Sequence, residues 1–265
     1  MESVTILQEK PVLFVQDLRV ARSGSLIIED VSLSVRKGEF IGIVGPNGGG
    51  KSTLLLSILG ILKWQQGNVT IYDHPPMSRE LNGKIGWVSQ AASNLPREIR
   101  ITVEELVRLG TFNAKNMFQR QSKNRNQLVD HAIEMVGLQD QRKNDVSKLS
   151  GGQRQRAVIA RALASNADFL LLDEPLVGID RESRNTLLKL LDDLCHNKNK
   201  TILMVSHDLA AIRQTSHRMI YLENGIKFDG PADQFPSLDE LANLRGIQNV
   251  HEKHHDHHSH IEVEQ

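Results

Sequence analysis

Short runs of consecutive apolar residues recur along this chain, separated by longer stretches in which apolar residues return at helical spacing. Such runs are typical of strands buried on both faces of a parallel sheet, and the intervening helices cover those faces. The predicted strands span residues 40–44, 84–88, 169–172, 201–206 and 219–222. The pattern therefore predicts an α/β fold built on a mostly parallel sheet core.

Two parts of the chain depart from this alternation. Residues 12–35 alternate between apolar and polar, with Gly24 at a turn, which predicts an antiparallel β edge piece. From about residue 96 to 148 the strand signals stop. Thr102, with Glu105 three positions later, predicts the start of a helix that runs to residue 109, and residues 127–136 form an amphipathic run. We expect a small helical subdomain over about 91–150.

Composition narrows the class of protein. Lys and Arg number 32, as do Asp and Glu, so the net charge is zero and we expect no nucleic-acid partner. The most apolar stretch, residues 54–62, is far shorter than the roughly 20 residues that span a bilayer. Residues 1–10 lack the pattern of a signal peptide, and the lone Cys195 has no disulfide partner. These features predict a cytosolic protein.

A glycine-rich motif, G-x-x-x-x-G-K-S, follows the first predicted parallel strand and precedes a helix predicted over 53–62. Glycines let backbone N–H groups turn toward phosphate oxygens, and a helix N-terminus adds positive potential. We expect Lys51 to reach the β- and γ-phosphates and Ser52 to bind Mg²⁺. A chance glycine-rich turn is the alternative, and the flanking strand and helix argue against it. The expected nucleotide contacts are Gly45, Pro46, Asn47, Gly48, Gly49, Gly50, Lys51, Ser52 and Thr53.

Two carboxylates end the predicted strand 169–172. Parallel sheets place ligands at the carboxyl ends of their strands. Asp173 is expected to hold Mg²⁺, and Glu174 to polarise the attacking water as general base. A solvated acidic strand end is common by itself, but the phosphate motif makes the catalytic interpretation the stronger one.

A third motif, Leu-Ser-Gly-Gly-Gln at 149–153, leads into a helix predicted over 154–164 and offers a second anion-binding helix N-terminus. Over about residues 12–230 the chain resembles the ATP-binding cassette (ABC) ATPases, which have the P-loop NTPase type of fold. The resemblance implies that the pentapeptide of one subunit closes over the ATP held by a second copy. The residues concerned are Ser150, Gly151, Gly152 and Gln153.

The resemblance assigns three further roles. Gln90 matches the glutamine that senses Mg²⁺ and contacts the membrane partner, and His207 matches the histidine at the γ-phosphate. Asp180 matches the aspartate that links the two sites across the dimer. One position departs from the family, because Arg22 stands where an aromatic residue usually stacks on adenine. A guanidinium can also stack on a purine, so we expect Arg22 to contact the base.

The cargo is suggested by residues 173–180, residues 205–209 and the C-terminal residues 231–265, which together resemble the zinc and manganese importer branch. Imidazole suits Zn²⁺, whereas Mn²⁺ prefers oxygen ligands. A polar, solvated tail without metal is the alternative. Six of the protein's 11 histidines are candidate Zn²⁺ ligands in the tail: His251, His254, His255, His257, His258 and His260.

These features predict an ATP-hydrolysing subunit that drives a zinc importer from the cytoplasmic face of the inner membrane. The expected partners are a second copy, a membrane permease and a separate metal-binding protein. Manganese, an iron chelate or another small solute are alternative cargoes. A soluble ABC ATPase acting on ribosomes or DNA is a rival, but such proteins generally carry two cassettes or long coiled coils, which this sequence lacks. Intact Lys51, Asp173, Glu174 and His207 argue against a non-catalytic metal-binding adaptor.

Overall fold

A six-stranded, mostly parallel sheet organises the structure, a computed structural model that describes residues 10–90, 100–112, 123–237 and 240–241. Neighbouring strands pair in parallel except for the last two, which are antiparallel. The α/β class and the parallel core predicted from the sequence are confirmed. The strand order is β5 (Ile85–Val88), β6 (Phe169–Asp173), β7 (Thr201–Val205), β3 (Phe40–Val44), β8 (Arg218–Glu223) and β9 (Gly225–Pro231).

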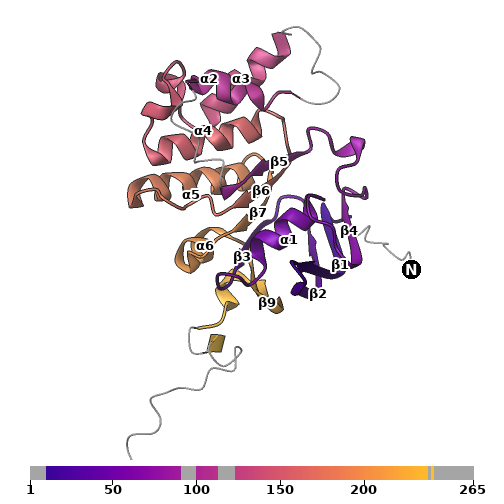
Figure 1. Cartoon of the computed structure of the whole chain (residues 1–265). Helices are drawn as coiled ribbons and strands as arrows, with labels where there is room; N and C mark the ends of the chain where they lie inside the picture. The colour runs from indigo at the N-terminus through magenta and orange to yellow at the C-terminus, as the bar shows by residue number, and fades with distance from the viewer. Residues whose placement is uncertain (1–9, 91–99, 113–122, 238–239, 242–265) are drawn as a thin grey trace, which may run out of the picture.

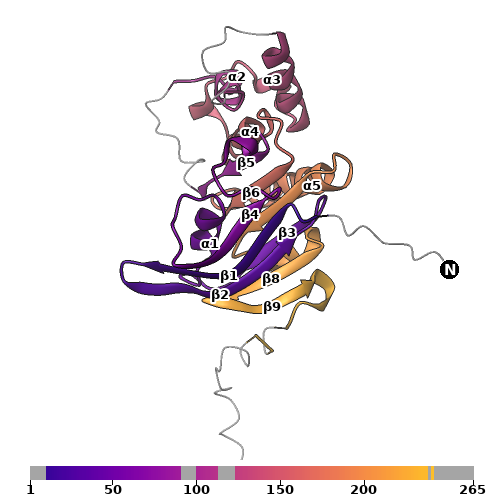
Figure 2. The ribbon, with the colours of Figure 1, turned by 90° about the vertical axis from the view of Figure 1, so that its right-hand side faces the viewer.

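A second, antiparallel sheet contains β1 (Leu13–Arg22), β2 (Ser25–Val35) and β4 (Gln66–Ile71), with β1 in the centre. Ser23 and Gly24 both have positive φ, as a two-residue hairpin turn requires. This sheet confirms the antiparallel edge piece. Figure 2 shows it beside β3, β8 and β9, at the end of the molecule opposite α2 and α3.

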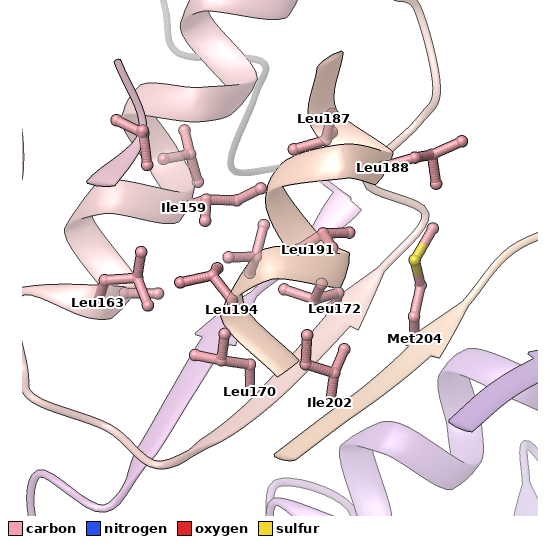
Figure 3. Close-up of a cluster of buried hydrophobic side chains, with 14 of the residues drawn as sticks. Ile159, Leu163, Leu170, Leu172, Leu187, Leu188, Leu191, Leu194, Ile202 and Met204 are labelled. Carbon is pink, nitrogen blue, oxygen red and sulfur yellow. The ribbon is translucent and has the colours of Figure 1, made fainter. Parts of the chain in front are cut away.

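Helices cover both faces of the large sheet. One face packs against α1 (Lys51–Ile58) and the antiparallel sheet, which share one apolar cluster. The other face packs against α4 (Gly151–Leu163), α5 (Arg181–His196) and α6 (Leu209–Thr215) (Figure 1). Figure 3 shows how leucines of α5 lie over β6 and β7, with Ile159 and Leu163 of α4 beside them. No described helix is both long enough and apolar enough to cross a bilayer.

Helices α2 (Val103–Leu109), α3 (Lys123–Met135) and α4 pack together at one end of the molecule (Figures 1 and 2). Thr102 and Glu105 form the predicted capping box. Glu104 joins this block, since its carboxylate accepts hydrogen bonds from Arg108 and Arg142 at 2.5 and 2.8 Å. Short 3-10 turns fill the remaining connections: Arg79–Leu81, Gln139–Gln141, Val146–Lys148 and Ala232–Gln234.

Several predicted boundaries were wrong by a few residues, and two strands were not predicted. The helix predicted over 154–164, α4, begins three residues before the predicted start because Ser150 caps it. Helix α1 ends at Ile58, four residues before the predicted end, and α3 begins at Lys123, four residues before the predicted start. The missed strands are β4 and β9. The division into a domain over 12–230 and a tail stays a prediction.

Candidate nucleotide site

The phosphate motif forms the loop between β3 and α1, in the middle of the large sheet. The loop lies against the end of β8, where a Cβ at Gly45 would come within 2.0 Å of the Leu222 carbonyl oxygen. Gly50 caps α1 with a left-handed φ of 95°, which favours glycine. The loop thus needs glycine at both ends, and its position places the N-terminus of α1 at a pocket.

This pocket has a volume of about 530 Å³ and collects most of the predicted nucleotide contacts. Its lining comes from the hairpin β1–β2, the phosphate loop, α1, and the residues that follow β5, β6 and β7. The lining residues are Arg22, Ile27, Asn47, Gly48, Gly50, Lys51, Ser52, Thr53, Gln90, Glu174, Val177 and His207. Gly45, Pro46, Gly49 and Asp173 lie in the same segments but do not line it. Sequence reasoning did not find Ile27 and Val177, whose only signal is an apolar side chain near a polar motif.

Lys51 is almost entirely buried beneath the loop. Its Nζ donates to the carbonyl oxygens of Gly45 and Pro46, both at 2.9 Å. Burial lowers the pKa of Lys51 below its ordinary value, and the nearby carboxylates Glu174 and Asp173 partly offset that effect. A cation held with little water interacts strongly with an anionic ligand, because screening is weak there.

Ser52 and Asp173 form a pair of oxygen groups next to Lys51. The Ser52 hydroxyl donates to Oδ1 of Asp173 at 3.1 Å, although the two residues are 121 positions apart. Burial raises the pKa of Asp173, while the hydrogen bond from Ser52 opposes that change. A hydroxyl and a carboxylate in contact are the hard oxygen donors that Mg²⁺ prefers, so this pair fits the predicted ion.

Glu174 and His207 lie at the end of the pocket formed by the residues after β6 and β7. Oε2 of Glu174 is 2.8 Å from Nδ1 of His207 and accepts a second hydrogen bond from the His207 backbone N–H at 3.3 Å. Glu174 has a φ of 51°, a strained conformation for a residue with a side chain. Its backbone N–H bonds to the Val205 carbonyl oxygen at 3.0 Å. The strained residue is therefore held by its neighbours on β7.

Arg22, at the end of the β1–β2 hairpin, lines the pocket together with the phosphate loop. The side chain is exposed, and none of the described residues forms a hydrogen bond or ion pair with its guanidinium. Ile27, which also lines the pocket, lies against the phosphate loop, since a Cβ on Gly50 would lie 3.1 Å from the Ile27 carbonyl oxygen. Gln90, which follows β5, lines the same pocket together with Glu174 and His207.

The pentapeptide residues Ser150, Gly151, Gly152 and Gln153 do not line this pocket. Ser150 and Gln153 instead form a capping box at the start of α4, and each side chain bonds the other's backbone N–H. A Cβ on Gly152 would lie 2.3 Å from Cβ of Ser183, so α4 and α5 touch at their N-terminal ends. Asp180, the N-cap of α5, accepts from the Ser183 N–H at 2.9 Å. These residues form a separate surface.

The remaining candidates concern metal and thiol chemistry. The six tail histidines lie outside the described residues. Among the residues that are described, no group of three or more His, Cys, Asp or Glu side chains is arranged to hold a metal. His196 and His217 lie together, with their Nε2 atoms 3.0 Å apart. Cys195 is buried, and burial raises its pKa to about 11, which agrees with an unreactive thiol.

A parallel sheet with a glycine-rich phosphate loop, a lysine beneath it and acidic residues at the carboxyl end of another strand defines a P-loop nucleoside triphosphatase. Comparison with known families agrees. Residues 28–177 match the family model described as ABC transporter, and this chain belongs to that family. It is an ATP-binding subunit, with ATP and Mg²⁺ as its ligands.

Curated relatives include proteins named for zinc uptake and for manganese transport. The zinc uptake system ATP-binding protein ZurA of Listeria innocua is 38% identical over 78% of this chain and 81% of its own length. The corresponding zinc uptake protein ZnuC of Bacillus subtilis is 38% identical over 85% of this chain and 97% of its own. The manganese transport system ATP-binding protein MntB of Listeria monocytogenes is 39% identical over 83% of this chain and 90% of its own length.

Solved structures show the same fold. CbiO1 of Clostridium perfringens, part of the ABC transporter complex cbiONQ, has a TM-score of 0.77 at 27% identity, covering 89% of this chain and 96% of that one. The ATP-binding cassette MJ0796, described as a dimer in a post-hydrolysis state with ADP and Pi, has a TM-score of 0.70 at 29% identity. It covers 84% of this chain, and all of its own chain is matched.

Proposed function

We propose that this chain hydrolyses ATP to drive a zinc importer, with each predicted site residue in the role assigned above. The observation that carries the proposal is the identity of 38% with zinc uptake ATP-binding proteins over 78% to 85% of the chain. The pocket supports the hydrolytic part, because it brings the phosphate loop, Gln90, Glu174 and His207 to one cavity.

The phosphate end of the pocket binds and orients the nucleotide. Lys51, now bonded to two loop carbonyls, would exchange these bonds for the β- and γ-phosphates. Ser52 and Asp173 would hold Mg²⁺, with Gln90 as a further ligand, and the bound ion neutralises charge on the phosphates. Backbone N–H groups at the start of α1 add donors for the same oxygens.

The Glu174 carboxylate is the proposed general base. Both hydrogen bonds that Glu174 accepts go to Oε2, and no described residue donates to Oε1. Oε1 is therefore available to take the proton of a water that attacks the γ-phosphate. His207 orients the Glu174 carboxylate through Nδ1 and would contact the γ-phosphate with its other ring nitrogen, Nε2. The strain at Glu174 agrees with a residue held for function rather than for stability.

The surface formed by Ser150–Gln153 is proposed to complete the site of a second copy. The N–H groups of Gly151 and Gly152 belong to the first turn of α4, where intrahelical acceptors are lacking, so they can bind an anion. They do not line this chain's own pocket, so a partner's nucleotide is the better candidate ligand. Asp180 lies at the same surface and would connect the two sites.

The transport complex is inferred to include a membrane permease and a separate metal-binding protein, with this subunit at the cytoplasmic face of the inner membrane. The names of the relatives as uptake-system components support this assembly. The histidine-rich residues 251–260 are proposed to bind Zn²⁺ and to reduce transport when cytosolic zinc is high.

Manganese is the second candidate cargo, because relatives named for manganese transport reach 39% identity over 83% of the chain. The histidine-rich tail favours zinc, since imidazole is a better ligand for Zn²⁺ than for Mn²⁺.

The test is the zinc, manganese and iron content of metal-poor cells, measured by mass spectrometry. Cells lacking the protein are compared with cells carrying Glu174→Gln. Loss of zinc alone in both supports the proposal. Loss of manganese alone transfers the function to the second candidate. If no metal changes, the cargo assignment is wrong, whereas a change in the deletion strain alone would remove Glu174 from the mechanism.

A further inference from the structure

An ion pair joins the catalytic end of the pocket to α5. Arg184, at the end of the first turn of α5, places Nη1 2.5 Å from Oδ2 of Asp208. Asp208 directly follows His207 in the chain. Its other oxygen, Oδ1, accepts a hydrogen bond from the Ala211 N–H at 3.0 Å and so caps α6. The Asp208 carboxylate therefore binds α5 and caps the N-terminus of α6.

Both ends of this ion pair are firmly held. Helix α5 is fixed on β6 and β7 by buried leucines, among them Leu187 and Leu188 (Figure 3). Helix α6 lies close on β3, because a Cβ at Gly42 would come within 2.1 Å of Cγ2 of Ile212. The Arg184 Nε is buried and has no hydrogen bond among the described residues, so Asp208 is the one described polar partner of this guanidinium.

His207 itself has little to hold it. Its side chain is 62% exposed, and its described polar contacts all go to Glu174. The position of its ring therefore depends on the backbone of residues 206–208. There, the Asp208 N–H bonds to the Ser206 hydroxyl at 3.1 Å, and the Asp208 side chain is only 19% exposed.

We infer that Arg184 is a positioning residue for hydrolysis, because it anchors Asp208 and thereby holds His207 against Glu174. The inference rests on the proposed roles of Glu174 and His207. Arg184 does not line the nucleotide pocket, so its loss affects the arrangement of the catalytic pair and leaves the binding of ATP intact.

The test is a double-mutant cycle on ATP hydrolysis by the full-length protein, using Arg184→Gln, Asp208→Asn and the combination. Asparagine keeps an oxygen that can cap α6, so Asp208→Asn removes the ion pair and leaves the cap. Each single variant is expected to lower kcat about tenfold with KM for ATP unchanged, as for an interaction needed in the transition state. The double variant is expected to be no slower than the slower single one.

Two further variants separate positioning from general damage. Arg184→Lys is expected to recover most of kcat, because the contact to Asp208 is made through one nitrogen and an ammonium can replace it. Arg19→Gln removes another arginine that pairs with an aspartate, Asp30, and neither residue lines the nucleotide pocket, so kcat is expected to stay unchanged. Thermal unfolding of every variant identifies any that fails to fold.

The inference is overturned if Arg184→Gln keeps the wild-type kcat, if KM rises with kcat unchanged, or if the two single losses multiply in the double variant. Glu174→Gln in the same assay keeps this result separate from the proposed function. Hydrolysis that persists in Glu174→Gln contradicts the catalytic assignment, whatever Arg184 does. Hydrolysis lost in Glu174→Gln but retained in Arg184→Gln contradicts the positioning role alone.

Discussion

At the scale of single residues, Glu174 combines a strained backbone with a side chain that is only 10% exposed. Glu174→Gln keeps the shape and loses the base, so we expect kcat to fall by at least about a hundredfold. ATP binding and ATP-dependent dimerisation should persist, since Lys51 and the loop are untouched. Single-turnover hydrolysis and size-exclusion chromatography with ATP measure the two effects. Glu134→Gln, an exposed glutamate of α3, is the matched control. Wild-type turnover in Glu174→Gln would exclude it as base.

Arg22 is the residue whose role differs most from the family pattern. Because its guanidinium has no described partner and faces the pocket from the hairpin, we expect Arg22→Ala to raise KM for ATP about two- to fivefold with kcat unchanged, the loss of one exposed stacking contact. Arg19→Ala serves as control, since the Arg19 guanidinium is held by both oxygens of Asp30 at 2.7 Å. Equal KM values for Arg22→Ala and wild type would remove Arg22 from the base site.

At the scale of elements, the helical block depends on Glu104. Its carboxylate binds Arg108 and Arg142, and Arg142 also binds Asp130 of α3. We expect Glu104→Gln to lower the free energy of unfolding by roughly 1–2 kcal/mol at pH 7, as for the loss of charged hydrogen bonds. Urea unfolding of both proteins measures the difference.

The pH dependence of that difference follows from the same contacts. The hydrogen bond from Arg142 is the main cause that lowers the pKa of Glu104 from 4.5 to about 2. Because the pKa of Glu104 is lower in the folded than in the unfolded state, ionised Glu104 stabilises the folded state at pH values above its unfolded-state pKa. This stabilisation is lost as the pH falls through the folded-state pKa. The gap between wild type and Glu104→Gln should therefore be constant above about pH 5 and shrink toward pH 2. A gap of equal size at pH 7 and pH 2.5 would contradict the electrostatic origin.

The elements that the sequence predicted and those it did not differ in a physical way. The parallel strands are apolar on both faces, so their residues alone identify them, as in Phe169–Asp173. Strands β4 and β9 are edges of their sheets, and β9 carries two glycines and ends in Pro231, which reads as a turn. The start of α4 was predicted too late because Ser150 and Gln153, which form its capping box, were interpreted only as part of an anion-binding motif.

At the scale of the whole molecule, the order of the motifs along the chain predicted the polar residues of the pocket better than the pattern of apolar and polar positions alone could. Gln90, Glu174 and His207 are far apart in sequence and meet because each follows a strand of one parallel sheet. The apolar members Ile27 and Val177 were missed, since nothing in the chemistry of such residues separates pocket from core. The Arg184–Asp208 pair was also missed, because a link between two helices has no local sequence signal.

The histidine-rich tail is proposed to make the ATPase activity of the whole protein sensitive to Zn²⁺. Outside the tail, His217 accepts from the Phe40 N–H through Nδ1 and meets His196 through Nε2, so this pair is already engaged. Deleting residues 251–265 should leave basal ATPase activity unchanged and remove its inhibition by added Zn²⁺. A full-length variant with the six tail histidines changed to serine should behave like the truncation and controls for length. Inhibition that persists in both would place zinc elsewhere, with the exposed His207 as the next residue to test.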